Sequence, residues 1–586
     1  MDGFYGKFLR INLTEKKVKE EKIPEEVQKK YLGGKGLASY LMLEYMKAKV
    51  DALSADNKLI FATGPATDTT VPAAGRHGVF AKSPLTGFFG ESYSGGYTAP
   101  AIRRTGYDAI MLEESSDQPV YLHVSDQGVD IKDASDLWGK ESYETEEALL
   151  DKVNVDGAQA VVIGPAGENL VKYACIKNNR WRSAGRTGLG AVMGSKKVKG
   201  IVFSGEQKAP LADEEMLKDY SRNLVKTCVN TDRTKNMKQK GTPYMVTTTN
   251  EASAFPTRYW AEGSFEKWRD ISTDAMRERM EVKPKGCYRC FMSCGKLSKV
   301  TDGRHKGLEL EGPEYETLYA IGGLCCVSPI EEVVYLNDVC DRLGLDTISG
   351  GNLVAFAIEA CKRGKLSGMP DYGDVDGIAK LFHQIAYREG IGELLSQGIK
   401  PASEKLGLED LVVHAKGMEP AGYDARSLPG MSLGYAVSNR GGCHLRSSFY
   451  MGELRGEIPL DMVEGKAEIF VDYESRNCVE DCLILCRFYQ QFIGWDGMQQ
   501  IIKASTGMDL SKDELYDLGR RVTTMAKQFN IREGWTKKDD SLPPRLFNDP
   551  IGPNKDRVVN ADNLAIMLRE YYELHGWDEE GRPSSE

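Results

Sequence analysis

Three cysteines lie close together near the middle of the chain, in the stretch GCYRCFMSCGK. Cys287, Cys290 and Cys294 follow the spacing C-x2-C-x3-C. Thiolates grouped in this way bind zinc or an iron–sulfur cluster, and either centre needs a fourth ligand. No second cysteine knuckle follows nearby, and His305 is a stray histidine. The pattern favours a [4Fe–4S] cluster with three local thiolates and one remote thiolate; a zinc site and three core thiols are the alternatives.

The remote thiolate has to come from the C-terminal part of the chain, where the candidates are Cys443, Cys478, Cys482 and Cys486. The sequence contains 13 cysteines, an odd number, and it has no apolar N-terminal segment of the kind that directs export. We therefore expect a cytoplasmic protein whose cysteines are reduced or bind metal.

Two acidic segments about one domain length apart resemble each other. DRLGLDTIS (341–349) and DCLILCRF (481–488) share the outline D-x-x-x-L-[D/C], and the second one ends in a cysteine. A pair of similar carboxylate turns suits a cofactor with two similar halves, each presenting N–H donors to an aspartate. Two unrelated helix ends are the alternative.

The glycine-rich stretch GRTGLGAVMGSKK (185–197) is a candidate phosphate loop. It matches neither the P-loop nor the dinucleotide-binding pattern. Backbone amides of such a turn, with Arg182, Arg186 and Lys196 nearby, can hold the phosphates of another cofactor. A structural tight turn is the alternative.

These residues need a scaffold of several domains, because 586 residues are too many for one hydrophobic core. Short apolar or alternating runs bounded by turn residues predict strands at 8–14, 58–64, 77–82, 109–114, 120–125, 160–165 and 199–205. Apolar residues at helical spacing predict helices at 213–229, 328–344, 352–364, 375–399 and 512–530. The change of period and a later Gly/Pro-rich interruption predict domains 1–208, 209–418 and 419–586.

Charge and hydropathy exclude two classes of partner. The net charge is −10 and no block of Lys and Arg occurs, so nucleic-acid binding is not expected. No apolar run reaches the roughly 18 residues that a membrane span needs, so no contact with a membrane is expected.

The motifs of the chain resemble those of the tungsten-containing aldehyde ferredoxin oxidoreductases along nearly the whole sequence. The resemblance rests on YGKFLRINLT, KYLGGKGLASYL, GRHGVFAKSPLTGFF, SGGY, GYDAIML, IGPAGENLVKYA, SAGRTGLGAVMGSKK, CYRCFMSCG, GPEYET, CDRLGLDTIS and NRGGCHLRSS. It implies an α+β fold in which a β-rich N-terminal domain forms a saddle under the cofactor and two mainly helical domains lie above it. The implied cofactors are tungsten held by the dithiolenes of two pyranopterins (tungstopterin), Mg²⁺ bridging the pterin phosphates, and a [4Fe–4S] cluster.

The resemblance also implies roles for individual residues. It makes Cys486 the fourth cluster ligand beside Cys287, Cys290 and Cys294. It assigns Arg76 to the space between cluster and pterin, where a fixed cation screens thiolate and phosphate charge, and Tyr93 and Ser183 to the Mg²⁺ region. The complete cofactor-binding set is Arg76, Tyr93, Arg182, Ser183, Gly185, Asp341, Leu345, Asp346, Asp481 and Leu485.

For catalysis the resemblance points to Glu316 in GPEYET and His444 in RGGCHL. A carboxylate beside a buried anionic metal site has its pKa raised and can accept a proton. A nearby imidazole can donate to an aldehyde oxygen as charge develops there. A helix cap for Glu316 and structural packing for His444 are the alternatives.

Two departures from the family pattern bear on assembly and ligation. Ile484 replaces the usual glycine of the second turn, and Cys482 offers a competing thiol. Some family members carry E-x-x-H before the first turn and bind a lone iron between two subunits, whereas this chain has YLND, with Tyr335 and Asp338. An iron-bridged homodimer is therefore not expected. We expect partner Fe–S or flavin subunits instead.

The predicted function is oxidation of aldehydes to carboxylic acids, with electrons leaving through the cluster to ferredoxin or a partner subunit. One alternative is the tungsten subunit of a complex that reduces benzoyl-coenzyme A. An alternative of another class is a non-catalytic electron-transfer or structural protein with an Fe–S or zinc site.

Overall fold

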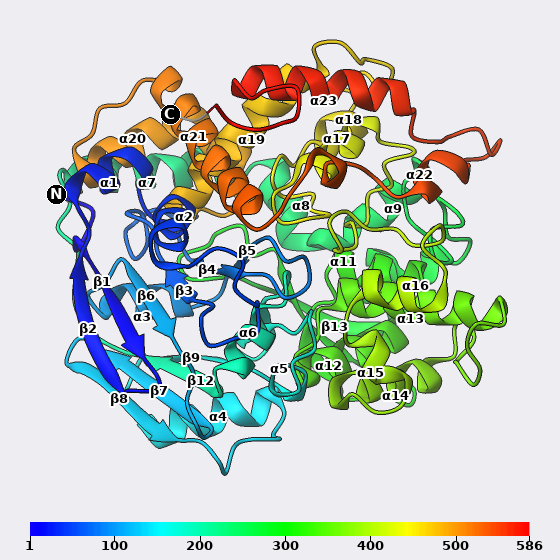
Figure 1. Cartoon of the computed structure of the whole chain (residues 1–586), viewed down its shortest axis with the longest axis horizontal. Coiled ribbons are helices and arrows are strands. Elements are labelled where there is room, and N and C mark those ends of the chain that lie inside the picture. The colour runs from blue at the N-terminus through cyan, green and yellow to red at the C-terminus, as the bar shows by residue number, and fades with distance from the viewer. Residues whose placement is uncertain (585–586) are drawn as a thin grey trace.

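The N-terminal part of the chain forms two six-stranded sheets that share one topology. The computed structural model describes residues 1–584, and Figure 1 shows the whole chain. The first sheet has the order β2-β1-β6-β3-β4-β5 and the second the order β8-β7-β12-β9-β10-β11. The first six strands are β1 (Lys7–Asn12), β2 (Lys17–Lys22), β3 (Leu59–Ala62), β4 (His77–Lys82), β5 (Phe89–Ser94) and β6 (Ala109–Glu113). The second six are β7 (Val120–Ser125), β8 (Gly128–Asp133), β9 (Gln159–Val162), β10 (Ile176–Asn178), β11 (Arg182–Ala184) and β12 (Val198–Phe203).

The two sheets correspond strand for strand. In each, the first strand pairs in parallel with the sixth, and the third strand pairs antiparallel with the sixth and the fourth. The fifth strands, β5 and β11, contact each other and join the sheets edge to edge. The N-terminal domain is therefore an internal duplication, built as a base with two equivalent halves.

The apolar runs of the sequence form the central strands, as expected. All seven strands predicted from these runs are present, and β3, β4 and β12 are buried along their whole length. The five unpredicted strands of the two large sheets include β2 and β8, which form hairpins at the outer edges with mostly exposed residues. β2 carries one apolar residue, Val18, and the alternation of β8 is limited to Val129 and Ile131, so both signals are weak.

Each half of the base contacts its own group of helices. Helix α2 (Gly34–Tyr45) packs against β3 and β4 on one side and against α19 (Lys466–Leu483) and α21 (Lys512–Arg532) on the other. On the second half, α4 (Ser142–Val153) contacts α12 (Ile330–Leu343), and α5 (Pro165–Glu168) contacts α14 (Val375–Tyr387). In Figure 1 the orange helices accordingly lie above blue α2, and the green helices lie beside α5.

The helical periodicity of the sequence predicted the main helices of the rest of the chain. The expected helices appear as α7 (Glu214–Cys228), α12, α13 (Thr347–Lys362), α14 followed by α15 (Ile391–Leu395), and α21. The α+β fold class, with a β-rich N-terminal part and a mainly helical remainder, is confirmed.

The remaining helices are α1 (Glu25–Tyr31), α3 (Thr98–Arg104), α6 (Leu189–Ser195), α8 (Asp232–Lys240), α9 (Met245–Glu251), α10 (Thr273–Arg279), α11 (Tyr315–Thr317), α16 (Ile399–Leu406), α17 (Pro429–Val437), α18 (Tyr450–Leu454), α20 (Gln490–Thr506), α22 (Pro544–Asn548) and α23 (Ala561–His575).

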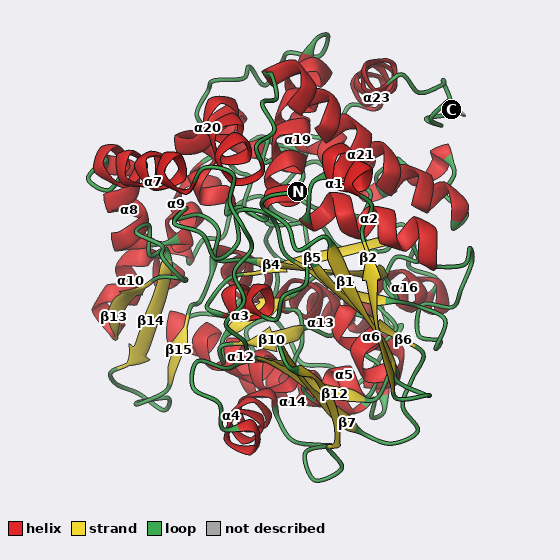
Figure 2. Cartoon of the chain, turned by 90° about the vertical axis from the view of Figure 1, so that its left-hand side faces the viewer, coloured by secondary structure: helices red, strands yellow, loops and turns green. Residues whose placement is uncertain are grey.

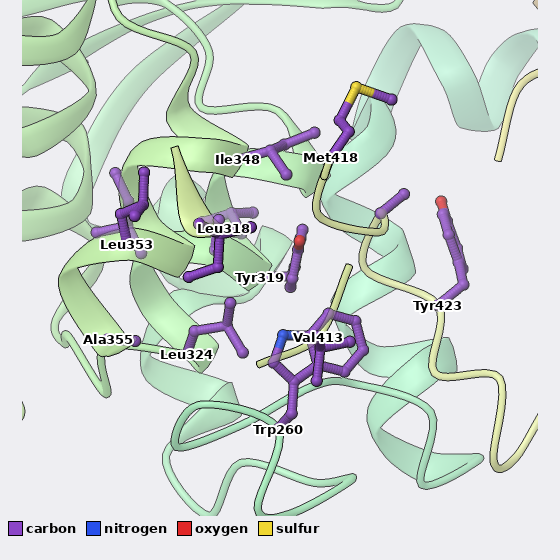
Figure 3. Close-up of a cluster of buried hydrophobic side chains, with 14 of the residues drawn as sticks. Trp260, Leu318, Tyr319, Leu324, Ile348, Leu353, Ala355, Val413, Met418 and Tyr423 are labelled. Carbon is purple, nitrogen blue, oxygen red and sulfur yellow. The ribbon is translucent and has the colours of Figure 1, made fainter. Parts of the chain in front are cut away.

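One large hydrophobic cluster fills the helical part. Figure 3 shows a portion of it, in which Trp260 and Tyr319 pack edge to face with ring centroids 6.2 Å apart. Their polar atoms are satisfied inside the core, since the Trp260 indole donates to Asn352 and the Tyr319 hydroxyl donates to the carbonyl of Pro420. The hydrophobic cluster contains residues from both sides of residue 418 and therefore does not mark a domain boundary there. The boundaries at 208 and 418 stay predictions.

A small sheet of β13 (Met280–Lys285), β14 (Gly295–Val300) and β15 (Glu309–Glu311) carries the cysteine run. β13 and β14 pair antiparallel from Met280–Val300 to Lys285–Gly295, so residues 286–294 form the connection at one end of this hairpin. Figure 2 shows the sheet at the edge of the molecule beside α8 and α10. Within residues 1–584, no helix is long and apolar enough to cross a membrane.

Candidate active site

The cysteine run forms a loop that faces the turn carrying Cys486. The ideal Cβ position of Gly95 lies 2.9 Å from the Cys287 sulfur, so a side chain at this position would push the thiol aside. Burial raises the pKa of the Cys486 thiol, the Arg76 guanidinium lowers it, and the thiols of Cys290 and Cys287 raise it again. Cys486 therefore shares one electrostatic environment with the cysteine loop.

The other remote cysteines are engaged elsewhere. Cys478 and Cys482 lie one turn apart on α19, where their thiols interact with each other, and both are buried. Cys443 accepts a hydrogen bond from the backbone N–H of Leu445, 3.3 Å away, and has Arg440 and Arg446 as its cationic neighbours. Of the four candidates, Cys486 is the one whose surroundings include the cysteine loop.

Among residues 1–584, no three His, Cys, Asp or Glu side chains converge closely enough to hold one metal ion. The kind of centre that Cys287, Cys290 and Cys294 hold, a [4Fe–4S] cluster or zinc, stays a prediction.

The two acidic turns have the same backbone structure. α12 ends at Gly344 (φ 76°) and α19 ends at Ile484 (φ 55°), both in the left-handed conformation. In each turn the next residue donates its N–H to the carbonyl five positions earlier: Leu345 to Cys340 and Leu485 to Glu480, both at 2.8 Å. These are Schellman-type helix ends. The similarity detected in the sequence is therefore a structural one.

Each turn docks on one half of the duplicated base. Gly64 follows β3, and its ideal Cβ lies 2.4 Å from the carbonyl oxygen of Leu483. Gly164 follows β9 at the equivalent position, and its ideal Cβ lies 2.6 Å from the carbonyl oxygen of Leu343. Any larger residue would displace the turns, so these two glycines form matched cradles for them.

The aspartates of the turns are buried and paired with cations. Asp341 forms an ion pair with Lys177 and accepts from the Asn337 amide at 2.9 Å. Burial raises the pKa of Asp341, and Lys177 opposes that rise. Asp346 accepts from the N–H of Ile348 as the N-cap of α13 and pairs with Arg186 at 2.8 Å.

In the second turn, Asp481 pairs with Arg446 at 2.5 Å and with Arg487 at 2.7 Å. Arg446 also reaches Glu91 at 3.0 Å, and Lys35 lies 3.2 Å from the same carboxylate. Burial opposes ionisation of Glu91, but Arg446 and Lys35 together lower its pKa to about 2. The turn is therefore set in a buried network of charges.

The remaining predicted cofactor residues lie near the seam between the sheets. Tyr93 in β5 and Ser183 in β11 occupy equivalent positions, one residue before the last in their strands. The Tyr93 hydroxyl donates to Glu91 at 2.6 Å, and Ser183 accepts from Lys177 at 2.6 Å. Gly185 follows β11, and its carbonyl accepts from the Cys175 thiol.

Two arginines provide positive charge beside the cysteine loop. Arg182 is paired with Glu311. Burial lowers the pKa of Arg182, and the thiols of Cys287 and Cys294 raise it. Arg76 reaches the Tyr93 carbonyl at 3.4 Å, while its Nε is buried without a partner. Arg76 thus has donor capacity left for an anionic group at this point.

Glu316 and His444 come together although 128 positions of sequence separate them. His444 Nε2 lies 3.5 Å from Glu316 Oε1, and Glu316 Oε2 accepts from the Gly422 N–H at 3.1 Å. Burial raises the pKa of Glu316 to about 8, although the Gly422 N–H and Arg186 lower it. Burial also lowers the pKa of His444, with Arg440 acting in the same direction.

The protonation change of Glu316 therefore lies near neutral pH, beside an imidazole that is neutral there. Glu316 belongs to α11, which runs directly into a π-helical turn, Leu318–Gly323; such turns are frequent at functional sites. Glu316 Oε1 makes no hydrogen bond, and 21% of the side chain stays accessible. Tyr423 and Tyr450 stack on each other at 3.8 Å and flank the His444 ring at 5.3 and 5.6 Å.

The ion-pair partners of the predicted residues were not predicted from the sequence. Lys177, Arg446, Arg487 and Glu91 hold the two turns in place, and Glu419 lies beside Arg186 with its pKa raised by burial to about 7. The repeated Gly-Pro after β3 and β9, in ATGPA and VIGPA, was a signal of the duplicated cradle that the sequence offered.

Comparison with known proteins identifies the family. The model described as "Aldehyde ferredoxin oxidoreductase, N-terminal domain" matches residues 8–205, and "Aldehyde ferredoxin oxidoreductase, domains 2 & 3" matches residues 219–586. The chain belongs to the aldehyde ferredoxin oxidoreductase family. It is 37% identical to the tungsten-containing aldehyde ferredoxin oxidoreductases of Pyrococcus abyssi and Thermococcus kodakarensis, over 99% of this chain and 98% of each relative.

More distant relatives show how far the fold extends. The chain is 30% identical to an aliphatic sulfonate oxidoreductase, WOR-like subunit, of Pyrococcus furiosus, over 100% of this chain and 96% of that protein. A solved structure of the active-site complex BamBC of benzoyl coenzyme A reductase with 1,5-dienoyl-CoA superposes with a TM-score of 0.86 at 24% identity, covering 99% of this chain and 96% of that one. The likeness to the benzoyl coenzyme A reductase structure, at 24% identity, shows only that the two chains share a fold.

Membership in a family of tungsten-containing enzymes implies a tungsten–pterin cofactor, and the chain fits such a group. The matched glycine cradles leave no room for side chains beneath the two turns, and Arg76 Nε and Glu316 Oε1 are buried without partners. Buried polar atoms of native proteins nearly always find a partner, so these atoms indicate a missing polar group in the region where the cofactor is expected.

Proposed function

We propose that this protein oxidises aldehydes to carboxylic acids at a tungstopterin and passes the electrons outward through a [4Fe–4S] cluster. The observation that carries the proposal is the Glu316–His444 pair, in a chain that matches curated tungsten-containing aldehyde ferredoxin oxidoreductases along its length. A carboxylate with a raised pKa beside a neutral imidazole suits proton transfer during addition of water to a carbonyl.

In this proposal the protein residues manage protons and position the substrate. Deprotonated Glu316 accepts a proton from the attacking water, and His444 donates a hydrogen bond to the aldehyde oxygen as negative charge develops there. Tyr423 and Tyr450 restrict the orientation of the substrate beside the imidazole. The bound tungstopterin supplies the two-electron redox chemistry, so that aldehyde and water yield acid, two protons and two electrons.

The cofactors are assigned to the residues that surround them. Asp341, Leu345 and Asp346 hold one pterin and Asp481 and Leu485 the other, in the matched turns. Arg182 and Gly185 contribute to cofactor binding near the seam. Tyr93 and Ser183, which lie at the seam, would be the residues beside Mg²⁺, and the ion would neutralise phosphate charge of the cofactor.

The cluster is assigned to Cys287, Cys290, Cys294 and Cys486, with Arg76 as the cation between cluster and pterin. Electrons leave one at a time to ferredoxin or to a partner Fe–S or flavin subunit. Reduction of benzoyl-coenzyme A is the weaker reading, because the likeness to that enzyme rests on the fold at 24% identity, whereas the aldehyde enzymes are 37% identical.

The decisive experiment measures W, Mo, Fe and Zn per chain on anaerobically purified protein and then assays an aldehyde panel with a viologen dye. We expect tungsten, about four Fe per chain from one [4Fe–4S] cluster, and dye reduction that depends on aldehyde. Protein that contains zinc and no tungsten would instead be the electron-transfer or structural protein, and metal-replete protein that reacts with no aldehyde would refute the proposed reaction.

The iron count also tests assembly. Tyr335 stacks on His305 with ring centroids 4.4 Å apart, and Asp338 pairs with Arg342 at 2.6 Å. Asp338 is thus held by an ion pair within the chain, and Tyr335 with Asp338 does not reproduce the Glu and His of the iron-bridging E-x-x-H. We therefore expect no iron beyond the cluster; extra iron lost together with dimerisation on chelation would contradict this.

A further inference from the structure

Helix α8 connects the two loops that carry the proposed cluster ligands. The Lys296 ammonium donates to the carbonyls of Met237 in α8 and of Cys294, at 3.0 and 2.8 Å. At the other end of the helix, Arg233 donates to the carbonyl of Phe488, two residues beyond Cys486, at 3.1 Å. The inner side of α8 is thus fixed against both loops.

The outer side of α8 is basic. Lys235, Lys238 and Lys240 are all exposed, and within the described chain none of them forms an ion pair with a carboxylate. Arg289 is exposed between Cys287 and Cys290 and is likewise unpaired there. Asp232 begins α8, and Asp274 and Glu278 belong to α10; all three are exposed. Figure 2 shows α8 beside β13 and β14 at the edge of the molecule.

This surface carries positive charge on an acidic protein. The chain has a net charge of −10, and some exposed lysines on other helices pair with carboxylates, as Lys29 does with Glu25 and Lys218 with Glu214. The unpaired lysines of α8 are set apart by their place, because their helix is bonded to both loops that carry the proposed cluster ligands. Asp232 is the one acidic residue of α8, so the helix as a whole is positive and attracts an acidic partner.

An aromatic side chain adjoins the other end of the cysteine loop. Tyr97 is 47% exposed, and its hydroxyl donates to the carbonyl of Gly286, at 3.4 Å. Tyrosine and arginine are enriched in protein interfaces, whose rims are polar. The cysteine loop therefore has an aromatic contact on one side and cations on the other.

We propose that Lys235, Lys238, Lys240 and Arg289 form the docking surface for a small acidic electron-carrier protein. The proposal rests on the proposed function, since it assumes that electrons leave through the adjacent cluster. In the transfer step the reduced cluster of this chain gives one electron to the oxidised iron–sulfur centre of the carrier, and no bond forms or breaks. Opposite charges steer the encounter and fix its orientation.

The test compares two variants that change the net charge equally. K235E/K238E/K240E reverses the α8 surface. K365E/K380E/K405E reverses three exposed lysines in the region of α13 to α16, away from α8. Binding of a purified acidic [4Fe–4S] ferredoxin to each holoenzyme is measured by calorimetry at low ionic strength, and turnover is measured with that ferredoxin and with a viologen dye.

The α8 variant should bind the ferredoxin at least about tenfold more weakly and lose most of its salt dependence, since a steered association becomes a repelled one. Its Fe and W contents and its dye turnover should equal those of the wild type, and the control variant should bind within about twofold of the wild type. Equal weakening in both variants, unchanged binding in the α8 variant, or self-association of the wild type through α8 would each overturn the docking surface. Absence of dye turnover in metal-replete wild type would refute the proposed function instead.

Discussion

The turns 341–346 and 481–486 are built alike and end differently. Both close a helix with a left-handed residue, both rest on a glycine of the duplicated base, and both begin with a buried aspartate. The sixth residue separates them. Asp346 caps α13, pairs with Arg186 and raises the pKa of Glu316, whereas Cys486 shares its surroundings with the cysteine loop.

Under the proposed function this difference would give two tasks to one repeated structure. The first turn would contribute charge beside Glu316 and His444, and the second turn would contribute a cluster thiolate. A two-fold base alone would hold a symmetric cofactor equally on both sides. A different residue at the sixth position, Asp346 in the first turn and Cys486 in the second, is enough to make the two sides chemically different.

The largest effect is expected at the sixth residue of the second turn. Cys486→Ala should lose most of the Fe and acid-labile sulfide, because three thiolates hold a cluster loosely. Cys482→Ala, one helical turn earlier, is the matched control and should keep both near the wild-type content. Exchange of the two outcomes, measured by metal and sulfide analysis, would assign the ligand to Cys482.

On the first-turn side, the largest effect is expected at the catalytic pair. Glu316→Gln and His444→Asn should retain tungsten and cluster but lower kcat on aldehydes by roughly 10²-fold, the usual scale for a lost acid–base group. Near-normal turnover at full cofactor occupancy would remove the residue concerned from the mechanism.

The pH profile tests how the first turn acts on Glu316. Its pKa is raised to about 8, and the proton acceptor must be deprotonated, so kcat/KM should fall as the pH drops below about 8. Asp346→Asn keeps a capping side chain at α13 but removes a charge that raises this pKa, so the acid limb should move to lower pH.

Asp374→Asn alters another helix cap, that of α14, and serves as the control. It should leave the acid limb in place. An acid limb that stays fixed in Asp346→Asn, or that moves equally in both variants, would show that the first turn does not influence Glu316.

The smallest effect concerns the left-handed position of the first turn. Gly344→Ala should lower stability by about 1 kcal/mol or somewhat more, because alanine is strained at this φ and its Cβ would meet the Gly164 nitrogen at 3.0 Å. Gly407→Ala, at the end of α16 (φ 63°), introduces a similar strain where the nearest atom, Lys365 Nζ, lies 3.9 Å from the ideal Cβ. Calorimetry at one scan rate should show the larger loss for Gly344→Ala; equal losses would mean that the cradle tolerates a side chain.

The second turn shows why glycine is not required at both places. Ile484 adopts φ 55° although branched side chains avoid that conformation. Gly34 and Gly78 lie against its side chain, with ideal Cβ positions 2.7 and 3.3 Å from Ile484 Cδ1. Two glycines that are distant in the sequence thus leave room for the side chain of the strained Ile484. No local pattern in the sequence reveals this relation.

The sequence by itself determined the features that depend on short-range order. Periodicity located the main helices and central strands, the spacing of Cys287, Cys290 and Cys294 indicated a metal centre, and the outline shared by the two acidic turns was a real structural repeat. Each of these is encoded within a few consecutive residues, where hydrogen bonding and side-chain alternation act directly.

Only the tertiary structure decided what lies together across long separations. Strands of the duplicated base retain alternation but little identity, so their common topology appears only once the sheets are paired. Lys177 and Arg446 become partners of the turn aspartates because the base brings them there. The reversal of the chain at Ile484 leaves Cys482 in the helix and carries Cys486 toward the cysteine loop. The spacing to Asp481 favours Cys486 over Cys482, and the contacts of Cys486 with the cysteine loop depend on the whole fold; the fourth ligand itself stays a prediction.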